Sequence, residues 1–319
     1  MIIAYQRFVF TLQAKDALVL PPYKGSTFRG GFGHALRRVV CALRRKECIE
    51  CLLQPRCVYA YVFETHPSGE SHTLGMHKYE AIPHPFIIEP PQESRRVYEP
   101  GDRLSFGLIL VGRAVDYLPY FVYAFDELGK SGIGKNKGGF SLLDVTSEGR
   151  EVYSVVDGTL RPPAANRMEF AAQEEQGATD VSTVGVRFVT PARIVYARRL
   201  TAEITFPVLV TSLLRRLFLL AHFHCGVDEP PWDVGKMIGA AQTVSTEKSD
   251  LRWWDWERYS ARQDVRMKMG GVVGTVTYGG ALGPFIPALQ AGEILHVGKG
   301  TTFGLGKYEL REQGISAIT

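Results

Sequence analysis

The chain has 319 residues, of which 45% are hydrophobic and 22% are charged, and its formal net charge is +4. This composition is that of a soluble globular protein, and the length fits about two domains of ~150 residues, each long enough to bury its own core. The small net charge excludes a surface that is basic all over, so any nucleic-acid site must be a local patch.

The N-terminal segment MIIAYQRFVFTLQA carries Gln6 and Arg7 within its apolar run and lacks the cleavage site of a signal peptide. We interpret it as a first strand over residues 2–13. The most apolar later stretch, residues 207–225, contains two arginines and is too short to span a bilayer comfortably. We therefore expect a cytoplasmic protein that does not enter a membrane, in which closely spaced cysteines are reduced or metal-bound.

The further elements of the first half are predicted from the periodicity of apolar residues and from the glycines and prolines that interrupt it. In chain order they are a helix over Thr27–Lys46, a cysteine-rich insertion to Cys57, a His- and Pro-rich connection through Pro91, a strand Arg103–Val111, a helix Tyr117–Leu128 and the segment GIGKNKGGFSLLDV (132–145).

The second half repeats this kind of organisation. Its expected elements are strands Val184–Val189 and Ile194–Tyr196, a long helix Pro207–Cys225, strands over 252–259 and 266–278, a helix Phe285–Ala291, a glycine-rich loop and a last strand. Residues 161–180 mix proline, alanine and charge, which is typical of a linker. We expect domains over 1–147 and 184–319, joined by a linker over 148–183.

A faint internal repeat supports this division. Each half passes from a short helix to a loop rich in glycine and lysine and then to a closing strand, GIGKNKGGFSLLDV in the first and VGKGTTFGLGKYEL in the second. The β-α-β-β-α-β order predicts an α+β protein of two tandem ferredoxin-like (RRM-like) domains, with the cysteine-rich insertion (41–57) in the first.

The glycine-rich segment HVGKGTTFGLGKYEL (296–310) fits neither common nucleotide-binding template. Phe303 stands where a dinucleotide fingerprint needs its third glycine, and Tyr308 follows Lys307 where a P-loop needs Ser or Thr. The residues after the loop alternate like a strand and do not open a helix. The segment is either a plain hairpin loop or a loop whose uncovered backbone N–H groups receive a phosphodiester backbone.

Four motifs occur together and in order: STFRGGFGHALRRVVC, the cysteine cluster continuing into CVYAYVFE, RYSARQ…MGGVVG, and HVGKGTTFGLGKY. With them the chain resembles, over nearly its whole length, the RAMP-superfamily CRISPR endoribonucleases that cut precursor CRISPR RNA within its repeats. The C-terminal glycine motif carries the resemblance most specifically.

The resemblance implies tandem ferredoxin-like domains and RNA cleavage without a metal, giving a 2′,3′-cyclic phosphate and a 5′-hydroxyl. It implies CRISPR repeat RNA as partner, with a CRISPR effector complex as a further one. The glycine loop would then contact the RNA backbone. Its candidate contacts are Gly298, Lys299, Gly300, Gly304, Gly306 and Lys307.

RNA carries its own nucleophile, the 2′-hydroxyl, so a cleaving protein needs a base of near-neutral pKa, an acid and nearby cations. Histidine suits these proton transfers best. A helical wheel places His34 and Arg38 on the polar side of the first helix, with Arg37 at its edge. The opposite, core side is predicted to hold Phe32, Leu36, Val39, Val40 and Leu43.

In the family a histidine of the first helix is commonly catalytic, and the FRGGFGHALRR match assigns this role to His34. Tyr23 and Lys24, just before the helix, are expected to help. The alternative is an exposed histidine without chemistry. His296 is the second catalytic candidate because it precedes the glycine loop, although a histidine in a strand is more often structural.

The stretch LRWWDWERYSARQ (251–263) interleaves tryptophans and a tyrosine with arginines. RNA-binding proteins use such pairs to stack bases and contact the backbone, but an amphipathic strand has the same pattern. Trp253 and Trp254 would point to opposite faces of a strand, so at most one face is expected to be exposed. Arg258 and Arg262 are the better RNA-binding candidates.

Four of the five cysteines fall within 17 residues. The tight pair Cys48 and Cys51 is a spacing that tetrahedral metal sites use, and Cys41 and Cys57 would complete a four-thiolate set for structural zinc or an iron–sulfur cluster. Reduced or partly disulfide-bonded cysteines are the alternative. No cofactor is expected for catalysis.

The leading hypothesis is therefore a metal-independent endoribonuclease acting on CRISPR repeats. The second is a non-catalytic RAMP subunit that only holds guide RNA in an effector complex, and a buried His34 would favour it. A nucleotide-binding enzyme is a remote third, because both glycine templates fail.

Overall fold

The computed structural model describes residues 1–43, 47–65, 82–170, 181–260 and 265–312. The described residues form two compact units. The N-terminal unit comprises Ile3–Arg167 and Phe223–Cys225, and the C-terminal unit comprises Met1–Ile2, Met168–His222 and Gly226–Thr319. The boundary falls within the expected linker, which itself contains strands β7 (Arg150–Ser154) and β8 (Asn166–Glu169).

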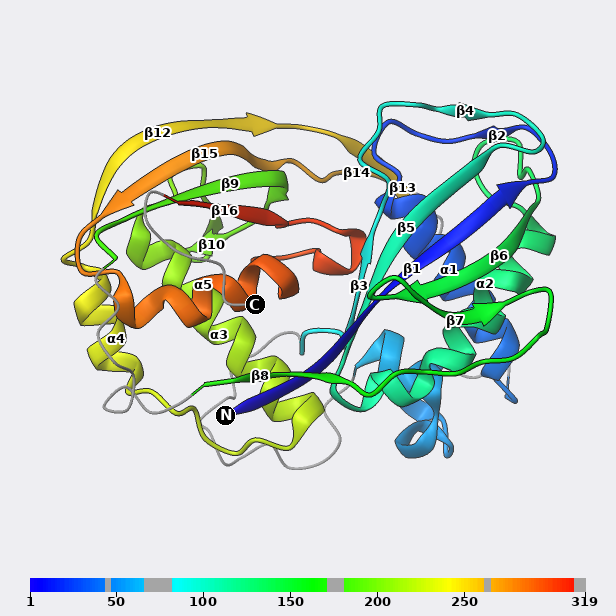
Figure 1. Cartoon of the computed structure of the whole chain (residues 1–319), viewed down its shortest axis with the longest axis horizontal. Coiled ribbons are helices and arrows are strands. Elements are labelled where there is room, and N and C mark those ends of the chain that lie inside the picture. The colour runs from blue at the N-terminus through cyan, green and yellow to red at the C-terminus, as the bar shows by residue number, and fades with distance from the viewer. Residues whose placement is uncertain (44–46, 66–81, 171–180, 261–264, 313–319) are drawn as a thin grey trace. The chain divides into compact units, whose positions relative to one another are not determined.

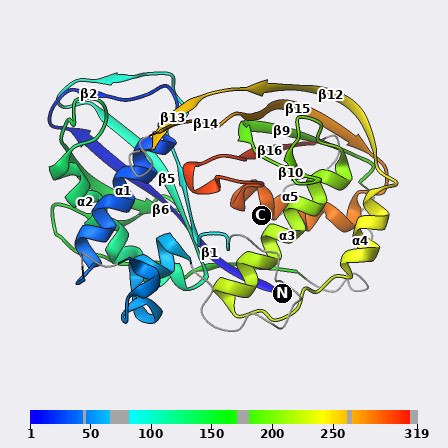
Figure 2. The same cartoon turned by 180° about the vertical axis from the view of Figure 1, so that it is seen from behind.

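The N-terminal unit is built on an antiparallel sheet in which the strand order is β3-β5-β1-β6-β7, with β8 also paired to β1. The elements are β1 (Ile2–Ala14), α1 (Gly25–Val40), β3 (Phe86–Glu89), β5 (Arg103–Val111), α2 (Leu118–Ser131) and β6 (Phe140–Ser147). Their chain order is the expected β-α-β-β-α-β. Both helices lie on the same face of the sheet (Figures 1 and 2).

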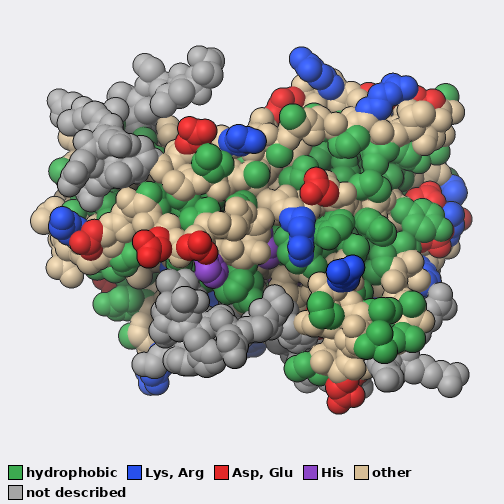
Figure 3. Space-filling view, turned by 90° about the horizontal axis from the view of Figure 1, so that it is seen from below, with side chains coloured by type: hydrophobic (Ala, Val, Ile, Leu, Met, Phe, Trp, Pro, Cys, Tyr) green, Lys and Arg blue, Asp and Glu red, His purple; other side chains and the backbone are tan. Residues whose placement is uncertain are grey.

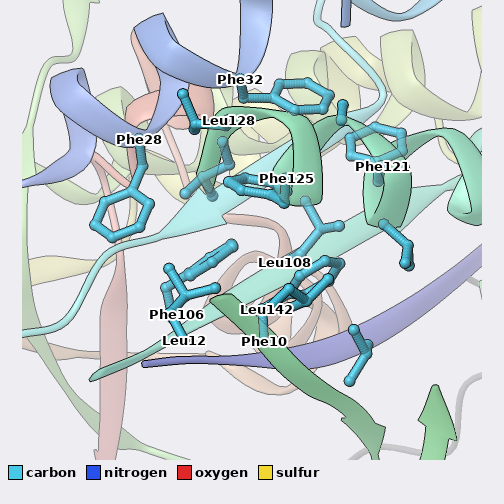
Figure 4. Close-up of a cluster of buried hydrophobic side chains, with 14 of the residues drawn as sticks. Phe10, Leu12, Phe28, Phe32, Phe106, Leu108, Phe121, Phe125, Leu128 and Leu142 are labelled. Atoms are coloured by element: carbon cyan, nitrogen blue, oxygen red, sulfur yellow. The ribbon is translucent and has the colours of Figure 1, made fainter. Parts of the chain in front are cut away.

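Strand β1 shows why this sheet has one buried face. Phe8, Phe10 and Leu12 are fully buried and alternate with more exposed residues, as the two-residue period of a strand requires. In the register with β5, Phe10 pairs with Phe106, and their rings are 5.1 Å apart. Phenylalanines from both helices complete this core (Figure 4), where Phe32 of α1 stacks on Phe121 of α2 at 4.7 Å.

Helix α1 begins two residues before the expected helix and ends at Val40, so the expectation of a helix to Lys46 is wrong. It ends because Cys41 adopts an extended conformation (φ −84°, ψ 110°). Phe32 and Leu36 are buried as predicted, whereas Val39 and Val40 are only half-buried at the end of the helix. Leu43 lies beyond it.

The cysteine-rich segment after α1 consists of short turns. They are the 3-10 turns η1 (Cys48–Glu50) and η2 (Gln54–Arg56) and the π-helical turn η3 (Ala60–Glu64). The connection that follows returns through β4 (Val97–Tyr98), which pairs with β2 (Leu18–Val19).

The C-terminal unit repeats the arrangement with strand order β12-β15-β9-β16. Its elements are β9 (Thr183–Ala192), β10 (Val195–Tyr196), β11 (Arg199–Leu200), α3 (Phe206–Cys225), α4 (Val234–Ala241), β12 (Ser245–Trp254), β13 (Glu257–Ser260), β14 (Val265–Lys268), β15 (Gly271–Gly279), α5 (Ile286–Leu295) and β16 (Tyr308–Glu312). Helices α3 and α5 lie on the same side of this sheet (Figures 1 and 2). Helix α4 was not predicted from the sequence.

Helix α3 confirms the expected long helix almost to the residue. Among the described helices it is the one long and apolar enough to cross a membrane by length and composition, and 61% of its most apolar window is buried within the protein. Leu209, Leu213 and Leu217 are among its buried side chains. Such burial is that of a core helix.

Candidate functional site

His34 is exposed on α1, in agreement with the helical wheel. Among the residues that the structure describes, none forms a hydrogen bond or ion pair with its imidazole. Gly30 lies one turn earlier on the same face, and a Cβ added there would meet nothing within 4 Å. Among the described residues, none therefore occupies the helix surface over Gly30, one turn before His34.

The neighbouring glycines of the FRGGFGH motif have a different role, because they allow close packing. A Cβ at Gly31 would lie 2.9 Å from Leu128, and a Cβ at Gly33 would lie 2.2 Å from the Phe63 ring. Each glycine costs a helix roughly 0.5–1 kcal/mol relative to alanine, so close packing has to offset that cost. The Arg29 guanidinium also lies over the Phe63 ring, 4.0 Å from its centroid.

The two arginines expected beside His34 are both on α1 but point to different neighbours. Arg38 is exposed, and its Nη2 donates to Ser131 Oγ and to the Glu127 carbonyl oxygen at the end of α2. Arg37 is half-buried, with its guanidinium 5.9 Å from the Tyr59 ring centroid. Arg38 is therefore the more accessible cation on the His34 helix.

The structure contradicts the helper role predicted for Tyr23 and Lys24, since both side chains are buried. Lys24 Nζ donates to the Glu93 carbonyl oxygen at 2.7 Å. Burial lowers the pKa of Lys24, and the nearby Glu93 carboxylate partly offsets this effect. Burial raises the pKa of Tyr23 well above its ordinary range. Lys24 is the residue immediately before α1, and its buried contact fixes where the helix begins.

His296 is fully buried, which removes it as a catalytic candidate. Its Nδ1 lies 3.1 Å from the Leu305 carbonyl oxygen, so the imidazole bridges the two ends of the glycine segment. The nearby Arg216 is also buried, and its Nε donates to the carbonyl oxygens of Leu295 at 2.9 Å and His296 at 3.1 Å. Burial lowers the pKa of Arg216 to about 10, and the guanidinium satisfies carbonyl groups at the end of α5.

We call residues 296–307 the C-terminal glycine loop. It is held against the end of β9 by backbone hydrogen bonds. Lys299 N–H donates to the Arg193 carbonyl oxygen at 2.8 Å, and Gly306 N–H donates to that of Pro191 at 3.0 Å. Gly298, Gly300, Gly304 and Gly306 all have positive φ, between 72° and 83°. The glycines are therefore required by the backbone path itself.

Only the first part of this loop is accessible. Lys299 is exposed and its neighbours Gly298 and Gly300 are half-buried, whereas residues 301–306 are buried. Gly304 and Gly306, predicted as RNA contacts, therefore support the loop from within. Lys307 is half-buried, and its N–H donates to Thr190 Oγ1 at 2.9 Å. The tip Gly298–Gly300 is the segment that a ligand can approach.

Strand β12 is exposed on both faces, contrary to the prediction that only one tryptophan would be exposed. Trp253 and Trp254 are each 40% exposed. Both tryptophans lie at the end of β12, an edge strand of its sheet that is followed by the β13–β14 hairpin. Arg258 lies in β13, and Arg262 lies outside the described residues.

Arg193 is a residue that the sequence analysis missed. Its guanidinium donates to the carbonyl oxygen of Gly270, which lies between β14 and β15, and its own carbonyl oxygen accepts from Lys299 N–H. It thus connects the β14–β15 link to the tip of the C-terminal glycine loop. No sequence pattern marks it, because both contacts arise only when distant strands pair.

The four clustered cysteines are free and half-buried. Burial raises the pKa of the Cys48 thiol, and Glu64, Cys57 and Cys41 act in the same direction, while Arg37 opposes them. Within the described ranges, however, the structure contains no group of three or more His, Cys, Asp or Glu side chains placed to hold a metal ion. The four-cysteine metal site therefore stays a prediction.

Surface charge agrees with the modest net charge of the sequence. On the face shown in Figure 3, basic side chains are interspersed with acidic and hydrophobic ones. No single-sign field covers that face, so a polyanion would have to be held by a few local contacts.

Two family descriptions match the chain. Residues 3–165 match the family described as the AF_1859_N N-terminal domain, and residues 186–308 match the CRISPR-associated endoribonuclease Cas6. An uncharacterized protein from Archaeoglobus fulgidus is 26% identical over 303 residues, which cover 92% of this chain and 93% of that protein.

Solved structures share the fold. A Cas6 product complex has a TM-score of 0.53 at 18% identity and covers 96% of this chain and 100% of the other. Thermus thermophilus Cas6 has a TM-score of 0.50 at 17% identity, with 97% and 99% coverage. A chain of a partial Cas6-RT-Cas1–Cas2 complex has a TM-score of 0.57 at 15% identity, with 99% and 47% coverage.

Proposed function

We propose that the chain is a CRISPR-associated RAMP-type endoribonuclease that cleaves CRISPR repeat RNA in precursor transcripts, and the family matches over residues 3–165 and 186–308 support this proposal. The exposed His34 on a helix face that also carries Arg38 is the observation on which this proposal depends. A non-catalytic RNA-holding subunit would need no accessible proton-transfer group at this position.

The reaction we propose uses the substrate's own 2′-hydroxyl. The imidazole of His34 accepts the 2′-proton while the 2′-oxygen attacks the adjacent phosphorus. A P–O2′ bond forms, the P–O5′ bond breaks, the departing 5′-oxygen takes a proton from water to become a hydroxyl, and the imidazolium returns its proton to the solvent. The products are a 2′,3′-cyclic phosphate and a 5′-hydroxyl, and no metal-activated water takes part.

The open space at Gly30, one turn before His34, supports this role, because among the described residues no side chain occupies it. In this proposal Arg38 stabilises negative charge on the phosphorane, and its hydrogen bonds to Ser131 and to the Glu127 carbonyl oxygen, which orient its guanidinium, support that role. Preorganised cations of this kind cost little rearrangement during the reaction.

We further propose two ferredoxin-like domains as the scaffold, with the tip Gly298–Gly300 and Lys299 contacting the RNA backbone. The β-α-β-β-α-β order of each unit supports the first point. We also propose that the protein works in the cytoplasm and associates with a CRISPR effector or integration complex. A structural zinc or iron–sulfur site would be held by Cys41, Cys48, Cys51 and Cys57.

The test compares His34→Ala with Arg38→Gln on the host's repeat RNA in the presence of EDTA. His34→Ala should lower the cleavage rate at saturating RNA by ~10² to 10⁴ and leave RNA affinity nearly unchanged, because it removes a proton-transfer group. Arg38→Gln should weaken both binding and rate. Wild-type-like cleavage by His34→Ala would refute the assignment, and binding without cleavage by the wild type would identify an RNA-holding subunit.

A further inference from the structure

The N-terminal unit contains a second glycine loop, residues 132–139, which we call the N-terminal glycine loop. It follows α2 and precedes β6, as the C-terminal glycine loop follows α5 and precedes β16. The two loops therefore occupy equivalent positions in the two β-α-β-β-α-β units.

The backbone geometry of the two loops agrees residue by residue at their start. The first residue after each helix, Gly132 or His296, has a positive φ (75° and 59°). The next residue is buried, and its N–H donates to a later glycine of the same loop. These bonds are Ile133 to Gly138 at 2.9 Å and Val297 to Gly306 at 3.0 Å.

The agreement continues at the glycine–lysine pair that follows. Gly134 and Gly298 have φ of 77° and 83°. A Cβ added at Gly134 would lie 2.4 Å from the Val19 carbonyl oxygen, and one added at Gly298 would lie 2.6 Å from the Arg193 carbonyl oxygen. Val19 and Arg193 each lie shortly after the first strand of their unit. The N–H of the next residue donates to that same oxygen, from Lys135 to Val19 at 2.9 Å and from Lys299 to Arg193 at 2.8 Å. Lys135 is thus the structural counterpart of Lys299.

The N-terminal loop is also held in place. Asn136 Oδ1 accepts from Val19 N–H at 3.2 Å, and its Nδ2 donates to the Ala17 carbonyl oxygen. Gly139 N–H donates to Asp16 Oδ2 at 2.9 Å. A loop fixed in this way presents its lysines without an additional entropy cost for ordering its backbone.

The lysines of this loop are available to an anion. Lys135 and Lys137 are exposed, as is Lys15 on the adjoining segment. In the part of the chain that the structure describes, none of the three forms an ion pair. Lys130, just before the loop, differs, since its Nζ lies 2.9 Å from Asp126 and 2.7 Å from Glu127. Unpaired cations on a fixed, glycine-rich backbone suit a phosphodiester chain.

We propose that the N-terminal glycine loop is a second binding site for the RNA phosphodiester backbone, with Lys135 and Lys137 as its phosphate contacts. This inference rests on the proposed function, because it extends RNA binding from one glycine loop to both. Each of the two units would then have its own contact with the RNA backbone.

The experiment measures RNA affinity between 50 and 200 mM salt by fluorescence anisotropy, with the host's single-stranded repeat RNA as probe. The variants are Lys135→Gln and Lys137→Asn, the latter because Lys137 has φ 52° and asparagine tolerates that conformation. Lys130→Gln is the matched control, since it removes one nearby charge that is already paired. Lys135→Arg keeps the charge and should behave as wild type.

The slope of log affinity against log salt concentration should be smaller in magnitude by ~0.7 in each loop variant than in the wild type. Over this fourfold salt range, the loss of affinity should therefore be about 2.6 times smaller in the variant than in the wild type. The control should keep the wild-type slope, and the thermal midpoints should agree. Loop variants with the full slope, in a wild type that binds and cleaves, would overturn this inference alone. A wild type that binds no repeat RNA would overturn the proposed function and this inference with it.

Discussion

Alanine at Gly306 should destabilise the protein through two separable effects, backbone conformation and steric clash. Gly306 has φ 72°, and an added Cβ would lie 1.8 Å from the Val297 carbonyl oxygen. Gly226, which ends α3, has nearly the same φ of 71°, but an added Cβ there would meet nothing within 4 Å. Gly226→Ala therefore measures the conformational effect alone.

The left-handed conformation costs a non-glycine residue about 1–2 kcal/mol, which is the expected loss for Gly226→Ala. At Gly306 the clash forces the chain apart as well. The separation threatens the bonds from Gly306 N–H to the Pro191 carbonyl oxygen and from Val297 N–H to the Gly306 carbonyl oxygen, both 3.0 Å. At about 0.5–1.5 kcal/mol for each bond, Gly306→Ala should lose a further 1–3 kcal/mol.

Urea unfolding and thermal midpoints of the two variants provide the measurement, since 1 kcal/mol shifts the midpoint of a domain of this size by about 2–4 °C. Gly306→Ala should also weaken RNA binding, because the loop tip at Lys299 depends on the same anchor, while Gly226→Ala should not. Equal destabilisation by both variants would show that the loop tolerates the Cβ and is not fixed as described.

Helix α1 and the cysteine cluster give two further predictions. Gly30→Ala should raise the free energy of unfolding by about 0.5–1 kcal/mol, because the position is helical and open. Gly33→Ala should lower it, because the added Cβ would lie 2.2 Å from the Phe63 ring and push it away. Urea midpoints measure both effects, and a Gly33→Ala variant more stable than the wild type would contradict this packing. Cys48→Ser with Cys51→Ser should lower stability more than the cleavage rate at saturation, since a structural metal stabilises only the folded state, and Cys225→Ser is the control. Anaerobically purified wild type without zinc or iron in elemental analysis would remove the premise.

The elements with strong local signals could be predicted from the sequence. Helix α3 begins one residue from its expected start and ends where expected, because a long apolar run is punctuated by proline at its start and glycine after its end. The exposure of His34 followed from the 3.6-residue period of α1. The end of α1 could not be predicted in this way, since Cys41 is extended although the residues after it are still compatible with a helix.

The burial of individual side chains and the contacts between distant segments could not be predicted from the sequence. Tyr23, Lys24 and His296 carry suitable chemistry next to the right motifs, yet the structure buries all three side chains. Arg193 has no motif, and its contact with Lys299 exists only because the loop returns to the end of β9. The correspondence of the two glycine loops was visible as a faint repeat, but the shared hydrogen bonds to Val19 and Arg193 join residues that are distant in the sequence and form only in the folded chain.

A single deoxynucleotide tests the proposed chemistry most directly. If the 2′-oxygen is the nucleophile, removing it immediately upstream of the scissile bond must block cleavage. The change leaves every phosphate charge in place, so affinity should change little. Denaturing gels of repeat RNA with and without the substitution, each in EDTA, measure cleavage, and anisotropy measures binding. A deoxynucleotide one position further upstream is the matched control and should be cut normally. Cleavage of the substituted RNA at the same bond would mean that a group other than the 2′-hydroxyl attacks the phosphorus, and His34 would then lose the role of accepting its proton.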